Sequence, residues 1–131
     1  MSTEQVTTAS EELLHKIETR TATASIVGMG YVGLPLAVAV FDAGFSVIGF
    51  DIDSHIITCL TNGESYLKHF GDDFSKGLAS SDRFYATGNH ADLGDADIIL
   101  LCVPTPLGPH KEPDLSFVLN STRQVAKILR R

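Results

Sequence analysis

The 131-residue sequence contains no tryptophan and only two cysteines, Cys59 and Cys102. Two isolated thiols build no disulfide framework, and their spacing does not suit a metal site. No apolar run approaches the roughly 20 residues that a membrane-spanning helix needs. The N-terminus is polar and acidic, so no secretory signal is expected there. These absences predict a protein of the reducing cytoplasm that does not contact the membrane.

Positive charge is also scarce. Ten lysines and arginines stand against 16 aspartates and glutamates, which gives a net charge of −6 at pH 7. Basic residues do not cluster before Arg130 and Arg131, so a nucleic-acid partner is not expected. The apolar fraction of 44% and the charged fraction of 20% are typical of a globular protein. The length suits one domain with its own core.

A glycine-rich segment, Gly28-Met-Gly30-Tyr-Val-Gly33, lies between an apolar run and a helical pattern. The pattern is weak evidence alone, but here it has the expected strand before it and helix after it. Gly28 permits a tight turn, Gly30 lets the backbone approach a pyrophosphate, and Gly33 lets the helix pack close to the strand. The helix N-terminus offers unpaired N–H groups and its positive dipole end to the phosphates. We expect cofactor contacts from these glycines and from Tyr31 and Val32 between them.

Asp51 ends the second apolar run, residues 46–51. A carboxylate there can accept hydrogen bonds from both hydroxyls of an adenosine ribose. It would repel the 2′-phosphate of NADP, and no arginine follows within reach, so NAD is favoured as the cofactor. Ile52 is expected to contact the cofactor, whereas Asp53 is expected to cap the next helix. In the alternative interpretation the glycines only make a turn and Asp51 is a solvated strand end.

Apolar periodicity predicts strands that alternate with helices. The expected strands cover about 24–28, 46–51, 84–87 and 96–103. The expected helical segments cover about 10–19, 31–43, 53–61, one or two short helices within 64–82, a turn at 89–93, and 115–129. This order predicts an α/β fold, the first half of a Rossmann-type doubly wound parallel sheet with strand order 3-2-1-4. Residues 1–20 are expected to form a tail and a short helix, and residues 21–131 a single domain.

A proline-containing loop, Val103-Pro104-Thr105-Pro106, follows the fourth expected strand. It lies at the carboxyl end of the sheet, where open α/β folds bind their ligands. The prolines stiffen the loop, and Thr105 presents a hydroxyl and a backbone N–H toward the crevice. Val103, Pro104 and Thr105 are therefore candidate cofactor contacts, although Thr105 could equally be a turn residue.

The remaining reactive side chains form no catalytic arrangement. Cys102 lies within the apolar strand and Cys59 on a helix, so both are expected to be inert thiols. No nucleophile has a visible activating base, and no catalytic residue or metal ligand is assigned. The histidines are scattered beside polar residues and are each expected to be solvated on the surface: His15, His55, His69, His90 and His110.

With these residues placed, the chain resembles the N-terminal NAD-binding domain of the UDP-glucose/GDP-mannose dehydrogenase family. The resemblance covers about residues 10–131, and GYVGLPLA together with VPTP is specific to this family among Rossmann proteins. The segment PLGPHKEPDLS favours the branch that acts on UDP-N-acetylhexosamines. The matching segments are IVGMGYVGLPLAVAVFDAGFSVIGFDID (26–53), NGESYL (62–67), ADIILLCVPTPL (96–107) and EPDLSFV (112–118).

Members of this family oxidise C6 of a nucleotide sugar from the alcohol to the carboxylate in two NAD-dependent steps. The resemblance implies that the three glycines carry the pyrophosphate loop and that Asp51 binds the adenosine ribose. It also implies that Thr105 contacts NAD near its nicotinamide half. Many members have a lysine or arginine five positions after the ribose carboxylate. Ile56 stands there in this chain, so weaker NAD binding is expected.

The family's catalytic cysteine forms covalent intermediates with the C6 carbonyl. It belongs to a glycine-rich motif far downstream, and neither Cys59 nor Cys102 matches it. We therefore expect the chain to be a truncated NAD-binding portion, inactive by itself and meeting a UDP-sugar only in the full-length enzyme. The alternative is a stand-alone NAD-binding or nucleotide-sensing module, while VPTP disfavours a 6-phosphogluconate-type or hydroxyisobutyrate-type dehydrogenase. A fourth strand without its next neighbour predicts an exposed sheet edge through which copies could associate.

Overall fold

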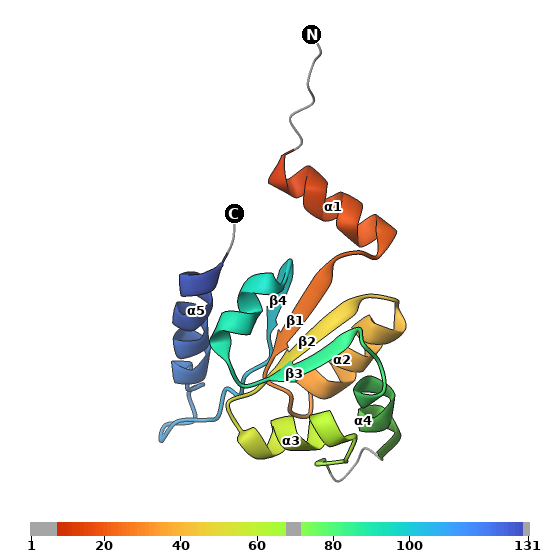
Figure 1. Cartoon of the computed structure of the whole chain (residues 1–131). Coiled ribbons are helices and arrows are strands. Elements are labelled where there is room, and N and C mark those ends of the chain that lie inside the picture. The colour runs from red at the N-terminus through yellow and green to blue at the C-terminus, as the bar shows by residue number, and fades with distance from the viewer. Residues whose placement is uncertain (1–7, 68–71, 130–131) are drawn as a thin grey trace.

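The computed structural model describes residues 8–67 and 72–129, with the side chains of 72–75 excepted. Four parallel strands form one sheet in the order β3-β2-β1-β4, as Figure 1 shows. They are β1 (Thr23–Val27), β2 (Ser46–Phe50), β3 (Phe84–Thr87) and β4 (Ile98–Leu101). The structure confirms the predicted doubly wound α/β fold and its strand order.

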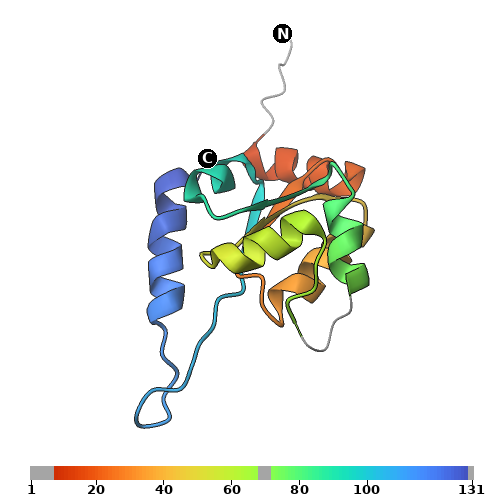
Figure 2. The same ribbon diagram turned by 60° about the horizontal axis from the view of Figure 1, so that its bottom comes forward.

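Helices cover both faces of the sheet (Figures 1 and 2). On one face lie α2 (Gly33–Asp42), α3 (Ser54–Asn62) and α4 (Asp72–Ala79). On the other face lie the short 3₁₀ helix η1 (His90–Asp95) and α5 (Ser116–Ile128). This arrangement follows from the crossovers, since each parallel strand must be reached from the far end of the one before it.

The core is divided by the sheet because side chains alternate along a strand. Ile26 and Val47 face α2, α3 and α4 in one buried cluster. Val27 and Phe50 face the other side, where they pack with Leu93 of η1. Apolar side chains of α5 pack against this second cluster and hold the helix on the sheet.

The helix α1 (Ala9–Thr19) stands beyond the amino ends of the strands (Figure 1). The hydroxyl of Thr8 caps it by accepting the N–H of Glu11 at 3.1 Å, the first bond of a capping box. The helix has no buried residue. The ion pair between Lys16 and Asp97, with 3.0 Å between Nζ and Oδ1, joins it to the start of β4.

Several predicted boundaries differ from the structure. The helix expected from residue 31 begins at Gly33, because residues 31 and 32 still belong to the turn. The strand expected over 96–103 is limited to Ile98–Leu101. The residues of β4 are only partly buried, and Leu101 is 38% exposed. Within the described residues β4 has a neighbour on one side only, which explains this exposure.

No helix among the described residues is long and apolar enough to cross a membrane. The stretch 64–82 contains α4, in agreement with the expected short helices. His69, expected on the surface, lies outside the described residues.

Candidate dinucleotide-binding site

The glycine-rich loop connects the carboxyl end of β1 to α2. Gly28 has a φ of 100°, and a Cβ at this position would lie 2.6 Å from the carbonyl oxygen of Cys102. A Cβ on Gly33 would overlap the carbonyl oxygen of Gly28. Both glycines are therefore required by the protein's own backbone. A Cβ on Gly30, in contrast, would meet no atom within 4 Å, so the space beside Gly30 is open to a ligand.

The N-terminus of α2 is open to an anion. Its N-cap residue, Val32, makes no side-chain capping bond, and the first turn contains no acidic residue. Tyr31 and Val32 are 59% and 69% exposed. The N–H groups of Leu34 and Leu36 already donate to the carbonyl oxygens of Gly30 and Val32, and Pro35 has no N–H. What α2 offers to an anion is therefore mainly the positive end of its dipole. This end can therefore take a phosphate group.

Asp51 follows β2 directly and points back to the loop. Its Oδ2 accepts the N–H of Met29 at 2.9 Å, and its Oδ1 accepts the N–H of Asp53 at 2.9 Å. These two bonds fix the plane of the carboxylate. An ionised carboxylate offers about four lone-pair sites, so each oxygen keeps one for a hydroxyl of a bound ribose.

Tyr66 holds the same loop from the opposite direction, a contact that the sequence analysis missed. Its hydroxyl donates to the carbonyl oxygen of Met29 at 2.6 Å. Both polar groups of the buried Met29 backbone are thereby bonded, one to Asp51 and one to Tyr66. Burial raises the pKa of Tyr66, and the nearby Asp51 carboxylate raises it further. Tyr66 is therefore a neutral hydrogen-bond donor at physiological pH. In the sequence, the signal for this role was the presence of the tyrosine in the segment NGESYL.

A cleft of about 370 Å³ opens between the carboxyl ends of β1 and β2 and the facing side of α5. It brings together Gly28, Asp51, Ile52 and Val103 from the predicted set. Ile52 is 75% exposed beside Asp51, and its contact with a cofactor stays a prediction. The other lining residues are Val27, Phe50, His90, Phe117, Asn120, Ser121 and Gln124.

The prediction that His90 is a solvated surface residue is wrong. Its ring packs on Phe50 with 4.6 Å between the ring centroids, and the residue lines the cleft. The contact was hidden from the sequence because it joins η1 to the end of β2. Among the other described histidines, His15, His55 and His110 are exposed as expected.

The loop after β4 extends away from the body of the molecule (Figure 2). Val103 reaches the cleft, whereas Pro104 and Thr105 are exposed and do not line it. The N–H of Asp114 donates to the carbonyl oxygen of Pro106 at 2.7 Å and closes the outer part of the loop. The carboxylate of Asp114 accepts the N–H of Ser116 at 2.9 Å, at the start of α5. A contact of Thr105 with the cofactor stays a prediction.

Neither cysteine has the character of a nucleophile. Cys59 is buried on α3, and burial, followed by the charges of Glu64 and Asp53, raises the pKa of its thiol. Burial also raises the pKa of Cys102. Since the thiolate is the reactive form, these positions fit the inert thiols that were expected. No group of metal-binding side chains occurs among the residues that the structure describes.

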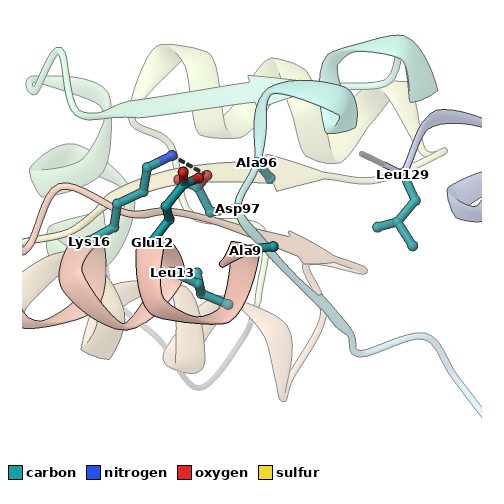
Figure 3. A pocket seen from close by; sticks show the side chains of 7 residues that line it. All are labelled: Ala9, Glu12, Leu13, Lys16, Ala96, Asp97 and Leu129. Atoms are coloured by element: carbon teal, nitrogen blue, oxygen red, sulfur yellow. Dashed lines mark hydrogen bonds and ion pairs between the residues drawn. The ribbon is translucent and has the colours of Figure 1, made fainter. Parts of the chain in front are cut away.

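A second cavity, of about 250 Å³, lies at the opposite end of the sheet, between α1, the start of β4 and the end of α5. Figure 3 shows the Lys16 side chain reaching Asp97, with Glu12 beside them and Leu13 and Leu129 at the rim. Asp97 also accepts the N–H of Thr23 at 2.9 Å. This arrangement attaches α1 to the sheet and is separate from the glycine-rich loop.

Comparisons with known proteins agree with this geometry. Residues 22–131 match the model of the UDP-glucose/GDP-mannose dehydrogenase family, NAD binding domain. Over 108 residues the chain is 32% identical to UDP-N-acetyl-D-mannosamine dehydrogenase of Pyrococcus horikoshii, a match that covers 82% of this chain and 26% of that protein. It is 35% identical to UDP-N-acetyl-D-glucosamine 6-dehydrogenase of Pseudomonas aeruginosa, with 82% and 24% covered.

Solved structures give the same result. The UDP-D-ManNAc dehydrogenase of P. horikoshii superposes with a TM-score of 0.75 at 31% identity and covers 83% of this chain and 26% of that one. A ternary complex of GDP-mannose dehydrogenase from P. aeruginosa superposes with a TM-score of 0.72 at 27% identity, with 78% and 24% covered. The chain thus spans about a quarter of the length of these relatives.

Proposed function

The chain belongs to the UDP-glucose/GDP-mannose dehydrogenase family and matches its NAD-binding domain, and we propose that it is the NAD-binding part of a nucleotide-sugar 6-dehydrogenase. Such an enzyme oxidises C6 of a UDP-sugar to the uronic acid, and NAD supplies the hydride acceptor. The observation that carries the proposal is the Asp51 carboxylate, fixed by two backbone N–H groups beside the glycine-rich loop.

The residues present fit the cofactor along the cleft. The open space at Gly30 and the uncapped start of α2 suit the pyrophosphate. Asp51 suits the adenosine ribose, and its negative charge disfavours a 2′-phosphate. Gly28 and Gly33 shape the loop itself, while Tyr31, Val32, Ile52 and the Val103–Thr105 segment are proposed contacts around it.

We assign the substrate to the UDP-N-acetylhexosamines. Curated relatives at 32–35% identity are named UDP-N-acetyl-D-mannosamine dehydrogenase and UDP-N-acetyl-D-glucosamine 6-dehydrogenase, and the PLGPHKEPDLS segment favours the same branch. The sugar nucleotide would be met by parts of the full-length enzyme outside this chain. The two free cysteines support a reducing, cytoplasmic location.

A stand-alone NAD-binding module is the second candidate. It is supported by the dinucleotide cleft, which lies within this chain, and by the absence of an activated thiol among the residues that the structure describes. The coding sequence after residue 131 distinguishes the two candidates. Continuation into a glycine-rich cysteine motif supports the dehydrogenase, and a stop codon there supports the module.

Titration calorimetry of the chain with NAD and NADP tests the proposed cofactor. We expect weak binding of NAD, because Ile56 replaces a basic residue near the adenosine end, and weaker binding of NADP. Absence of heat with millimolar NAD would contradict the proposal. Equal affinity for both dinucleotides would remove Asp51 from its role at the ribose.

A further inference from the structure

The first three N–H groups of the glycine-rich loop differ in whether the protein itself uses them. The N–H of Gly28 donates to the carbonyl oxygen of Phe50 at 2.8 Å, and the N–H of Met29 donates to Asp51 at 2.9 Å. The N–H of Gly30 donates to no acceptor among the described residues. A backbone N–H needs an acceptor from the protein, water or a ligand, so in segment 28–30 the Gly30 N–H is the donor left for a ligand.

The direction of the Gly30 N–H is set by the carbonyl group of Met29. The two groups belong to one peptide unit, and no peptide bond among the described residues is cis. In a planar trans peptide the N–H and the C=O point in opposite directions. Because the Met29 carbonyl oxygen accepts the hydroxyl of Tyr66 at 2.6 Å, the Gly30 N–H points away from Tyr66.

Tyr66 is held in place by contacts outside the glycine-rich loop. It follows the end of α3, where Gly63 is left-handed and the N–H of Glu64 donates to the carbonyl oxygen of Cys59 at 2.8 Å. The ring of Tyr66 packs against the buried cluster between the sheet and the helices α2, α3 and α4. The tyrosine hydroxyl therefore meets the loop from a fixed position.

The hydrogen bond from Tyr66 restrains a peptide unit that would otherwise turn easily. Glycine permits more φ values than any other residue, so Gly30 alone does not fix the plane of its own N–H. A donor on the carbonyl oxygen also polarises the peptide unit and strengthens its N–H as a donor. A donor that is already oriented loses less entropy when a ligand binds.

We infer that Tyr66 is a positioning residue for the cofactor, since its hydroxyl holds the Gly30 N–H toward the place proposed for the pyrophosphate. The inference rests on the proposed binding of NAD. Tyr66 acts through the peptide unit between Met29 and Gly30. It gives a role to the segment between α3 and α4, which supplies none of the residues that line the cleft.

Tyr66→Phe tests the inference, because it removes the hydroxyl and keeps the ring in the core. By calorimetry the variant should bind NAD about twofold to tenfold more weakly, as expected for the loss of one hydrogen bond. The second readout is the amide proton of Gly30 in nitrogen-15 NMR spectra. At saturating NAD its downfield shift should be smaller in the variant than in the wild-type chain. A residue that only stabilised the fold would leave this saturated shift unchanged.

Tyr85→Phe is the matched control, because Tyr85 is 56% exposed on β3, away from the loop. It should keep the wild-type NAD affinity and Gly30 shift. A thermal melt shows whether each variant folds. The wild-type chain provides a measurement that needs no variant: NAD should move the Gly30 amide proton downfield more than that of Gly28, which is already bonded to Phe50.

Three results decide the matter. NAD binding by the wild-type chain without a downfield shift of Gly30 would overturn the inference and leave the proposed function standing. A wild-type value of either readout in Tyr66→Phe would do the same. Failure of the wild-type chain to bind NAD would overturn both the inference and the proposed function.

Discussion

The peptide groups of Met29 show how single residues hold the cofactor loop. Asp51 accepts the Met29 N–H, and Tyr66 donates to the Met29 carbonyl oxygen. Asp51 and its position at the end of a strand were evident from the sequence. The contribution of Tyr66 was not, because its partner lies 37 residues away in the chain.

The first residue-scale prediction concerns Asp51→Ala. Hydrogen bonds to a charged group contribute about 1.5–3 kcal/mol, so NAD should bind about tenfold to a hundredfold more weakly. Discrimination against NADP should also fall, because the repelling charge is gone. Calorimetry with both dinucleotides measures the two effects. Asp53→Ala is the control: it removes the cap of α3 and should lower stability without a change in selectivity.

A second residue-scale prediction separates the roles of the glycines. Gly30→Ala meets no protein atom within 4 Å, so its melting temperature should stay close to that of the wild type while NAD binding is weakened. Gly33→Ala places a methyl group against the carbonyl oxygen of Gly28 and should destabilise the fold. Thermal melts and calorimetry on both variants measure the difference. Wild-type NAD affinity in Gly30→Ala would show that the pyrophosphate lies elsewhere.

At the scale of elements, local sequence patterns predicted most of the helices and strands. The cap predicted at Asp53 is observed at the start of α3, and the helix ends at Gly63 in the left-handed conformation. The predicted extent of β4 was wrong, because the apolar content of a segment does not show how many neighbouring strands it pairs with. The division into a lead-in of residues 1–20 and a domain of 21–131 stays a prediction, in keeping with an α1 that has no buried residue.

The element-scale prediction concerns the exposed edge at β4. Unpaired backbone groups along an edge strand favour pairing with another copy, so the chain should self-associate as its concentration rises. Leu101→Lys places a charge at this edge and should shift the chain toward monomer in sedimentation velocity. Tyr85→Lys, on the opposite edge strand β3, is the matched control. Dissociation by the control alone would place the contact at β3.

At the scale of the whole molecule, the proposed cofactor cleft lies at the carboxyl end of the sheet, and the helix α1 is attached to the opposite end. Burial raises the pKa of both cysteines, and thiolate formation therefore requires a higher pH than for a free thiol. The described part of the chain offers a place for NAD and no activated nucleophile for a sugar aldehyde.

The whole-molecule prediction follows from that chemistry. The chain mixed with NAD and UDP-N-acetylglucosamine should form no NADH, as followed by absorbance. The full-length relative from P. aeruginosa, named UDP-N-acetyl-D-glucosamine 6-dehydrogenase, provides the positive control. NADH formation by the 131-residue chain would contradict its assignment as a catalytically incomplete portion.

The glycine-rich loop, the helix caps and the alternation of strands and helices could be predicted from the sequence, whereas the preference for NAD over NADP stays a prediction. These depend on residues that are close in the chain: glycines that permit a turn, caps that begin helices, and a carboxylate at a strand end. The other contacts of the site became visible only in the folded chain. His90 reaches Phe50, Tyr66 reaches Met29, and α5 presents Gln124 to the cleft, because folding brings together segments whose local patterns contain no information about one another.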